Sequence, residues 1–308
     1  LLWLLAFAIA TVFFLLFMDS LEYIWVLLAL IFIRMGVGSI YFQTEMSLLP
    51  KLLDNEDLKI AEEIHSIIWS ISYALGMAVS GFYIHYFGTT SAFIADMVIY
   101  MIGFYVLLGL TIPSLKSPKS SSVMALIVSG LSYLKAHPKI IHLIFLHASV
   151  GLSTYDALIA LLADYEYKAI YSAALVMGLI NATRAVSLFL GQILFSRYIN
   201  EKTLFWVFIA QGATIITWGL LQSNFYVSFI GVFLSGLFMT TLWAYTYTLL
   251  QYETQEAYYG RVIAYNDMVF MGMSTLVSFA IGALFEAGVM LWVITCLLGV
   301  GFICFGFY

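Results

Sequence analysis

The chain has 308 residues, of which 63% are hydrophobic and 9% are charged, and its formal net charge is −5. A water-soluble domain carries about 45–50% apolar and about 25% charged residues, so this composition excludes a soluble globular protein and indicates a membrane protein. No run of basic residues is present, which argues against nucleic-acid binding. The two cysteines, Cys296 and Cys304, lack the spacing of a disulfide framework or a metal site.

The first part of the chain contains four apolar segments long enough to cross a bilayer. A spanning helix needs about 20 mostly apolar residues, whereas barrel strands would be about ten residues long with alternating polarity. The segments are residues 1–18, 23–45, 64–87 and 90–112. We therefore predict an all-α polytopic fold. The chain opens with Leu1-Leu2-Trp3-Leu4-Leu5 and no initiator Met, so we expect a fragment that begins inside a spanning helix.

A polar segment, residues 113–139, separates these helices from a second group. Within it, residues 123–134 are apolar but too short to span, and they predict a helix lying along the membrane interface. Six further spanning segments are predicted at residues 140–162, 171–196, 203–221, 225–249, 263–285 and 287–308. We thus expect about ten transmembrane helices. They would form two bundles, 1–112 and 140–308, joined by a linker.

The distribution of basic residues predicts the orientation. Loops rich in Lys and Arg stay in the cytoplasm. If the linker is cytoplasmic, alternation of the helices places one loop cation, Lys168, outside. The loop cations on the cytoplasmic side are then Lys51, Lys59, Lys116, Lys119, Lys135, Lys139, Arg197, Lys202 and Arg261. We therefore expect a protein of the cell (inner) membrane with both ends of this chain in the cytoplasm.

The order of four helices, a basic linker with an interfacial helix, and six helices resembles the major facilitator superfamily with its first two helices missing. Leu30, Arg34 and Gly38 are similar to the family's fourth-helix pattern. Gly76-Met77-Ala78-Val79-Ser80-Gly81 resembles the fifth-helix motif of drug and proton antiporters, although Met replaces its Pro and Ser replaces one Gly. Tyr259-Gly260-Arg261-Val262 resembles the turn before the eleventh helix of efflux-type exporters. The resemblance implies a secondary transporter of the efflux type.

Four ionisable residues within spans are candidates for proton coupling, because a charge in the bilayer is costly and therefore often functional. The resemblance assigns Arg34 to proton coupling or to holding an acidic partner, and a structural Arg satisfied by backbone carbonyls is the alternative. Asp96 either exchanges protons or hydrogen-bonds a neighbouring helix as a neutral acid. Asp156 and Arg184 are predicted to pair, either as a fixed salt bridge or as a titrating pair.

Polar and aromatic residues within spans are candidates for a substrate cavity or for interhelical hydrogen bonds. These cavity candidates are Trp69, Tyr73, His147, Asn181, Trp243, Tyr245 and Tyr247. Candidates for gate or loop contacts are Arg197, Arg261 and Asp267, of which Asp267 is expected to cap a helix start or to form a salt bridge with Arg261.

Covalent catalysis is not expected, because no nucleophile, metal cluster or phosphate-binding loop is recognisable. No cofactor or metal is therefore predicted. We expect a monomeric secondary transporter, driven by protons or another ion, that exports a small amphipathic molecule by proton antiport. Proton-coupled uptake of a polar nutrient remains open, as does a membrane receptor or assembly protein without transport.

Overall fold

The structure is a computed structural model that describes residues 2–16, 21–52, 55–109 and 122–308. In these ranges the secondary structure is helical and no strand occurs. Seven of the described helical segments are long and apolar enough to cross a membrane, and the apolar helices Leu2–Leu15 and Leu291–Gly306 are shorter. The predicted all-α polytopic fold is confirmed, and the chain is an integral membrane protein.

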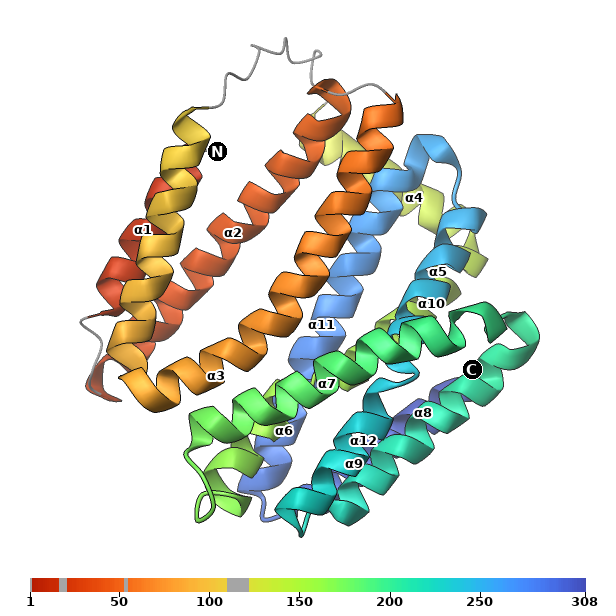
Figure 1. Cartoon of the computed structure of the whole chain (residues 1–308). Coiled ribbons are helices and arrows are strands. Elements are labelled where there is room, and N and C mark those ends of the chain that lie inside the picture. The colour runs from red at the N-terminus through yellow and green to blue at the C-terminus, as the bar shows by residue number, and fades with distance from the viewer. Residues whose placement is uncertain (1, 17–20, 53–54, 110–121) are drawn as a thin grey trace. The chain divides into compact units, whose positions relative to one another are not determined.

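The described helices form two compact units, Leu1–Lys116 and Ser117–Tyr308. The first unit consists of α1 (Leu2–Leu15), the short helix η1 (Leu21–Tyr23), α2 (Ile24–Leu52) and α3 (Asn55–Leu108) (Figure 1). Helix α1 contacts both α2 and α3. Its buried residues Leu5, Ala8, Val12 and Leu15 recur every three or four positions, so they form one stripe that faces these neighbours.

Helix α3 is interrupted at Gly88, where φ is 80° and ψ is 164°. Glycine adopts a positive φ without the steric cost that a Cβ imposes. The interruption falls in the gap between the predicted segments 64–87 and 90–112, so α3 contains the first segment and the described part of the second as far as Leu108. The sequence predicted two segments here, and the structure identifies Gly88 as the residue between them.

The second unit begins with α4 (Val123–Ala136), which precedes one interrupted span. This span consists of α5 (Pro138–Ala148), η2 (Ser149–Ser153), α6 (Asp156–Leu161) and η3 (Leu162–Glu166). The remaining elements are α7 (Ala173–Phe195), η4 (Ser196–Tyr198), α8 (Glu201–Leu221), α9 (Phe225–Gly236), α10 (Met239–Glu253), η5 (Glu256–Tyr258), α11 (Tyr259–Glu286) and α12 (Leu291–Gly306).

Close helix packing in the second unit depends on small residues. Helix α8 lies between α9 and α12 and contacts both (Figure 1). A Cβ on Gly212 of α8 would lie 2.5 Å from the backbone oxygen of Gly299 on α12, and a Cβ on Gly299 would lie 2.6 Å from the oxygen of Gly212. The two backbones approach this closely because neither residue has a side chain, which is a common form of helix contact in membranes.

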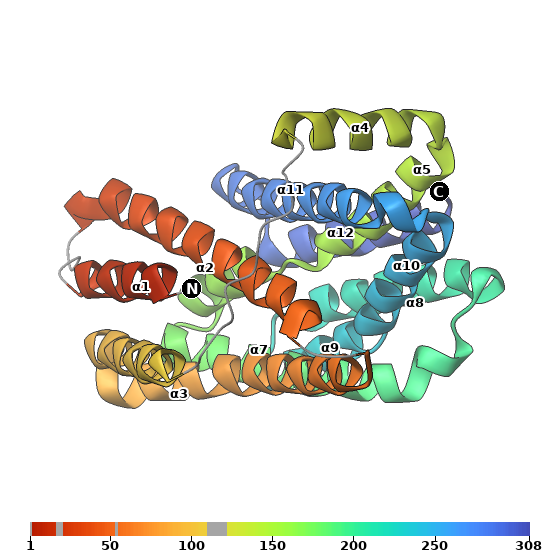
Figure 2. The ribbon, with the colours of Figure 1, turned by 90° about the horizontal axis from the view of Figure 1, so that it is seen from above.

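Helix α4 packs against α5 and α11, and Figure 2 shows it alongside these helices. Tyr133 and Leu134 of α4 are buried, and the Tyr133 ring stacks on that of Tyr258 at 4.1 Å. The opposite face exposes a second apolar row, which consists of Met124, Ile127, Val128 and Leu131. Helix α4 is therefore apolar on both faces, as suits a helix in contact with both protein and lipid.

Candidate functional site

In the first unit, Arg34 and Asp96 form an ion pair between two membrane-spanning segments. Arg34 lies in the span Ile24–Tyr41 of α2, and Asp96 lies in the span Leu75–Leu108 of α3. The Arg34 Nη2 atom donates to Asp96 Oδ2 over 2.5 Å. Each charge reduces the cost of placing the other in the bilayer. Arg34 thus binds an acidic partner, Asp96.

Tyr100 completes this cluster. Its ring centroid lies 5.6 Å from the Arg34 guanidinium carbon, within the range of a cation–π contact. Tyr100 follows Asp96 by one helical turn, so both side chains project from one face of α3. The Arg34 and Asp96 side chains are 29% and 34% exposed, so the ion pair is only partly buried.

In the second unit, His147 is surrounded by aromatic rings. The imidazole of His147, which is 1% exposed, lies 5.6 Å from the Trp243 ring, 5.4 Å from the Tyr247 ring and 5.6 Å from the Phe270 ring. Trp243 and Tyr247 stack on each other at 5.1 Å, one turn apart on α10. Three of the predicted cavity residues therefore lie together in one cluster, which we call the His147 cluster (His147, Trp243, Thr246, Tyr247 and Phe270).

The hydrogen bonds of Thr246 determine which ring nitrogen of His147 donates. The Thr246 hydroxyl donates to the carbonyl oxygen of Leu242 over 2.8 Å, so its oxygen is left to accept from His147 Nδ1 at 2.9 Å. With the hydroxyl hydrogen on the Leu242 carbonyl, the proton is assigned to His147 Nδ1, and Nε2 is then the acceptor of the neutral ring. The cluster thus combines an aromatic surface with one polar ring atom.

The predicted pairing of Asp156 with Arg184 is not formed in the structure. Arg184 Nη2 donates to the carbonyl oxygen of Ser153 over 2.8 Å, and its guanidinium lies 4.9 Å from the buried Tyr155 ring. The span is interrupted between η2 and α6, and in place of a helical i+4 bond the Ser153 carbonyl accepts from Tyr155 N–H over 2.9 Å as well as from Arg184. Asp156 occupies the first turn of α6 and is exposed, so Arg184 binds the interrupted backbone instead of the carboxylate.

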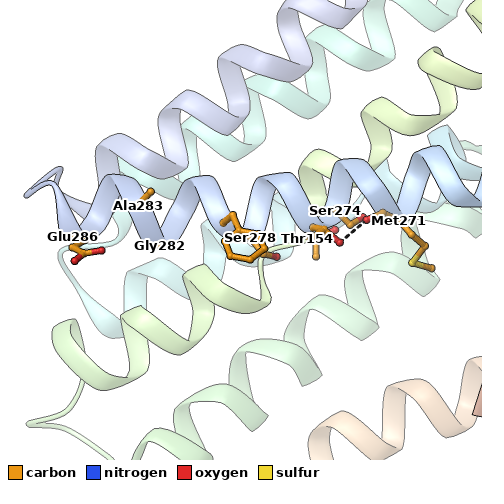
Figure 3. Close-up of a pocket in the computed structure, with 9 residues that line it drawn as sticks. Thr154, Met271, Ser274, Ser278, Gly282, Ala283 and Glu286 are labelled. Atoms are coloured by element: carbon orange, nitrogen blue, oxygen red, sulfur yellow. Dashed lines mark hydrogen bonds between the residues drawn. The ribbon is translucent and has the colours of Figure 1, made fainter. Parts of the chain in front are cut away.

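A groove with a volume of about 620 Å³ runs along one face of α11 beside this interruption. Figure 3 shows Thr154 across from Ser274 and Ser278, with Met271 at one end and Glu286 at the other. Phe279 contributes an exposed ring. The buried Ser274 hydroxyl has no hydrogen-bond partner within the described part of the chain. Among the residues that line the groove, Glu286 carries the charge.

This groove was not predicted from the sequence, because most of its lining is neither ionisable nor aromatic. Ser, Thr and Gly are common in membrane helices, so a single one of them does not indicate a binding site. Their spacing is more informative: residues 271, 274, 275, 278, 282 and 286 recur every three or four positions along α11. This spacing places them on one face of the helix.

The other cavity candidates lie apart from the His147 cluster or outside the described side chains. Asn181 is buried in α7, and Tyr245 is half-buried on α10. Trp69 and Tyr73 belong to α3, and their side chains lie outside the described residues.

The gate candidates make local contacts. Arg261 donates to Ser129 Oγ of α4 over 3.0 Å and lies 4.8 Å from the Tyr258 ring. The exposed Arg197 lies 4.8 Å from the neighbouring Tyr198 ring. Asp267 does not cap a helix start as expected, because α11 begins at Tyr259 and places Asp267 in its third turn. Its carboxylate accepts from Asn266 Nδ2 over 3.2 Å.

The chain was compared with protein families and with curated proteins. The family model described as Major Facilitator Superfamily matches residues 1–278 of the chain. No curated protein that was compared with the chain matches it. The match covers all of α1 to α10 and most of α11, so it includes the Arg34 ion pair and the His147 cluster.

Proposed function

Since the chain belongs to the major facilitator superfamily and is therefore a secondary transporter, we propose that it exports a small amphipathic organic molecule in exchange for protons. Members of this family are generally transporters rather than enzymes, and two helical bundles move around a site near the bilayer midplane. The Arg34–Asp96 ion pair is the observation that supports proton exchange most directly.

Proton exchange at Asp96 would act through the ion pair. A proton that binds the Asp96 carboxylate removes its negative charge and with it the attraction to Arg34. Arg34 cannot lose its own charge, so the guanidinium would keep its contact with the Tyr100 ring and attract another partner. The ion pair thus has two states that differ by one proton, which is the requirement for coupling a proton gradient to a conformational change.

The substrate class is inferred from the second unit. The His147 cluster offers the Trp243 ring, which is 42% exposed and stacked on Tyr247, and the α11 groove offers hydroxyls, an exposed ring and a carboxylate. Sites with mostly apolar walls and a few polar groups favour amphipathic organic molecules. Because Glu286 is the charged residue of the groove, neutral or cationic compounds are favoured over anions.

The test is proton flux in proteoliposomes that contain the full-length protein. A pH gradient is imposed, and lumenal pH is followed while amphipathic dyes and antibiotics of different charge are added. We expect a cationic or neutral compound to evoke proton movement in the direction opposite to its own. Arg34→Ala and Asp96→Asn should each abolish this movement. Lys202→Ala, which removes a cation from an exposed position at the start of α8, is the matched control and should retain it.

Two results would overturn the proposal. Proton movement in the same direction as the compound would identify uptake instead of export. Compound-evoked flux that persists unchanged in both Arg34→Ala and Asp96→Asn would show that the ion pair serves stability only.

We also propose that the linker side of the membrane is cytoplasmic. Helix α7 separates the loop that contains Lys168 from the loop that contains Arg197 and precedes Lys202, and the larger number of cations on the second side supports this orientation. After replacement of Cys296 and Cys304 by Ser, Lys168→Cys should react with an impermeant maleimide in intact cells. Lys202→Cys should react only after permeabilisation, and the reverse pattern would contradict this orientation.

A further inference from the structure

A second cavity, of about 580 Å³, lies at one end of the second unit. It is formed where membrane-spanning segments terminate: Glu166 ends one span, Leu221 and Glu286 end two others, and α12 begins at Leu291. The cavity is therefore expected at the level of the lipid headgroups. It is separate from the α11 groove, and no residue lines both.

The lining of this cavity, which we call the Glu166 pocket, changes from apolar to polar. Leu162 and Leu291 are buried and form an apolar part. The exposed polar and aromatic residues are Tyr165, Glu166, Ser223 and Trp292, and the apolar Leu220 and Met290 are exposed beside them. The Tyr165 ring lies 4.7 Å from that of Phe285. No Lys or Arg lines the pocket. Among the described residues Glu166 has no ion-pair partner, so its negative charge is available to a ligand.

Gln222 adds an acceptor to this lining. It is 2% exposed and lines the pocket. Gln222 Nε2 donates to Thr295 Oγ1 over 2.7 Å, and the Thr295 hydroxyl donates in turn to the carbonyl oxygen of Leu291. This chain fixes the orientation of the amide and leaves Gln222 Oε1 without a donor within the described part of the chain. A buried acceptor without a donor costs free energy, and an N–H group that reached Oε1 from the pocket would recover that cost.

We propose that the Glu166 pocket binds the primary ammonium group of an amphiphile. The Glu166 carboxylate supplies the opposite charge, and Tyr165 and Trp292 supply the aromatic faces that attract cations. Glu166 and Gln222 accept N–H hydrogen bonds, and Leu162 and Leu291 contact the adjacent apolar chain. A phospholipid with an ethanolamine headgroup and a soluble amine share this chemistry. The proposal does not depend on the direction of transport or on proton coupling.

The test compares two lipids that differ only in the headgroup nitrogen. The full-length protein is placed in nanodiscs of phosphatidylglycerol with either phosphatidylethanolamine or phosphatidylcholine, and the midpoint of thermal unfolding is measured. Ethanolamine carries three N–H donors and choline none. We expect the midpoint to be several degrees higher with phosphatidylethanolamine. Glu166→Gln should remove most of this difference, whereas Asp164→Asn should retain it, because Asp164 is exposed on the same turn but does not line the pocket.

Equal midpoints in the two lipids, together with no rise on addition of soluble ethanolamine, would overturn the proposal, and so would a lipid difference that Glu166→Gln leaves intact. Soluble ethanolamine, added to nanodiscs of phosphatidylglycerol alone, distinguishes the two sources of the ammonium. A rise in the midpoint that Glu166→Gln abolishes would support a soluble amine as ligand. Absence of a rise, together with a positive lipid comparison, would support the phospholipid.

Discussion

Arg34 and Asp96 are separated by 62 positions in the chain, yet Arg34 Nη2 lies 2.5 Å from Asp96 Oδ2. The contact joins α2 to the part of α3 that follows Gly88. It is one of two salt bridges among the described residues, and the other, Lys139–Glu253, is more exposed. The Arg34–Asp96 pair is therefore a distinctive electrostatic feature of the first unit.

The two halves of this ion pair should differ in how well the protein tolerates their loss. Without Arg34, Asp96 can become neutral by binding a proton, but without Asp96 the Arg34 charge remains in the bilayer. Asp96→Ala should therefore lower the unfolding midpoint more than Arg34→Ala does. The double variant should lose less stability than the sum of the two single losses. Thermal unfolding of all three variants in one detergent checks this, and equal, additive losses would contradict it.

Thr246 should contribute to stability through His147. Thr246→Val keeps the shape of the side chain but leaves the buried His147 Nδ1–H without its acceptor, at a cost of about 1–3 kcal/mol. Thr248→Val is the matched control, because the Thr248 hydroxyl bonds a carbonyl of its own helix, that of Ala244. Chemical denaturation should separate the two variants, and equal effects would mean that the bond to His147 contributes nothing.

Trp243 should contribute to substrate affinity. It is 42% exposed and stacks on Tyr247 beside His147, so it presents an aromatic face to a ligand. Loss of one stacked ring is worth about 0.5–1.5 kcal/mol beyond its buried area. The loss of apolar area buried against the ligand weakens binding further. Trp243→Ala should therefore raise the KM for an exported aromatic compound roughly tenfold. Trp206→Ala, at an exposed position on α8, should leave KM unchanged.

The contact between α8 and α12 should not tolerate a side chain at Gly212. A Cβ there would lie 2.5 Å from a backbone oxygen of α12, which cannot rotate away, so the helices must separate. Overpacking of this kind typically costs about 1–3 kcal/mol. Gly212→Ala should lower the unfolding midpoint, whereas Gly272→Ala should not, because no atom lies within 4 Å of a Cβ at Gly272. An unchanged midpoint for Gly212→Ala would mean that α12 shifts without cost.

The helices were predictable from sequence because apolar segments of spanning length leave the backbone few alternatives in lipid. The gap between residues 87 and 90, where Gly88 lies, and the helical segment at residues 123–134 followed from the same reasoning. Which ionisable groups meet was harder to predict. Arg34 and Asp96 were both identified, but their pairing depends on how α2 and α3 pack, which spacing along the chain does not encode.

Arg184 illustrates the opposite case. Its predicted partner Asp156 was plausible by position, but the interruption at Ser153 offers a carbonyl oxygen that satisfies the guanidinium instead. The prediction that Asp267 caps a helix start was wrong for a related reason. The turn Tyr259-Gly260-Arg261 is helical in the structure, so α11 begins earlier than hydropathy indicated. Polar residues at the end of an apolar segment mark the membrane boundary, whereas the helix itself continues into the aqueous phase.

The packing of α4 has a consequence for how the protein could be divided. Although α4 follows the first group of spans in the chain, its contacts are with α5 and α11. Two hydrogen bonds hold α4 against α11: Arg261 donates to Ser129, and Tyr265 donates to the Ile127 carbonyl. When the chain is expressed as two separate polypeptides, the cut belongs before Ser122. A cut after Ala136 would give α4 to the polypeptide that lacks its packing partners, and the second polypeptide would present an uncovered apolar surface at α11.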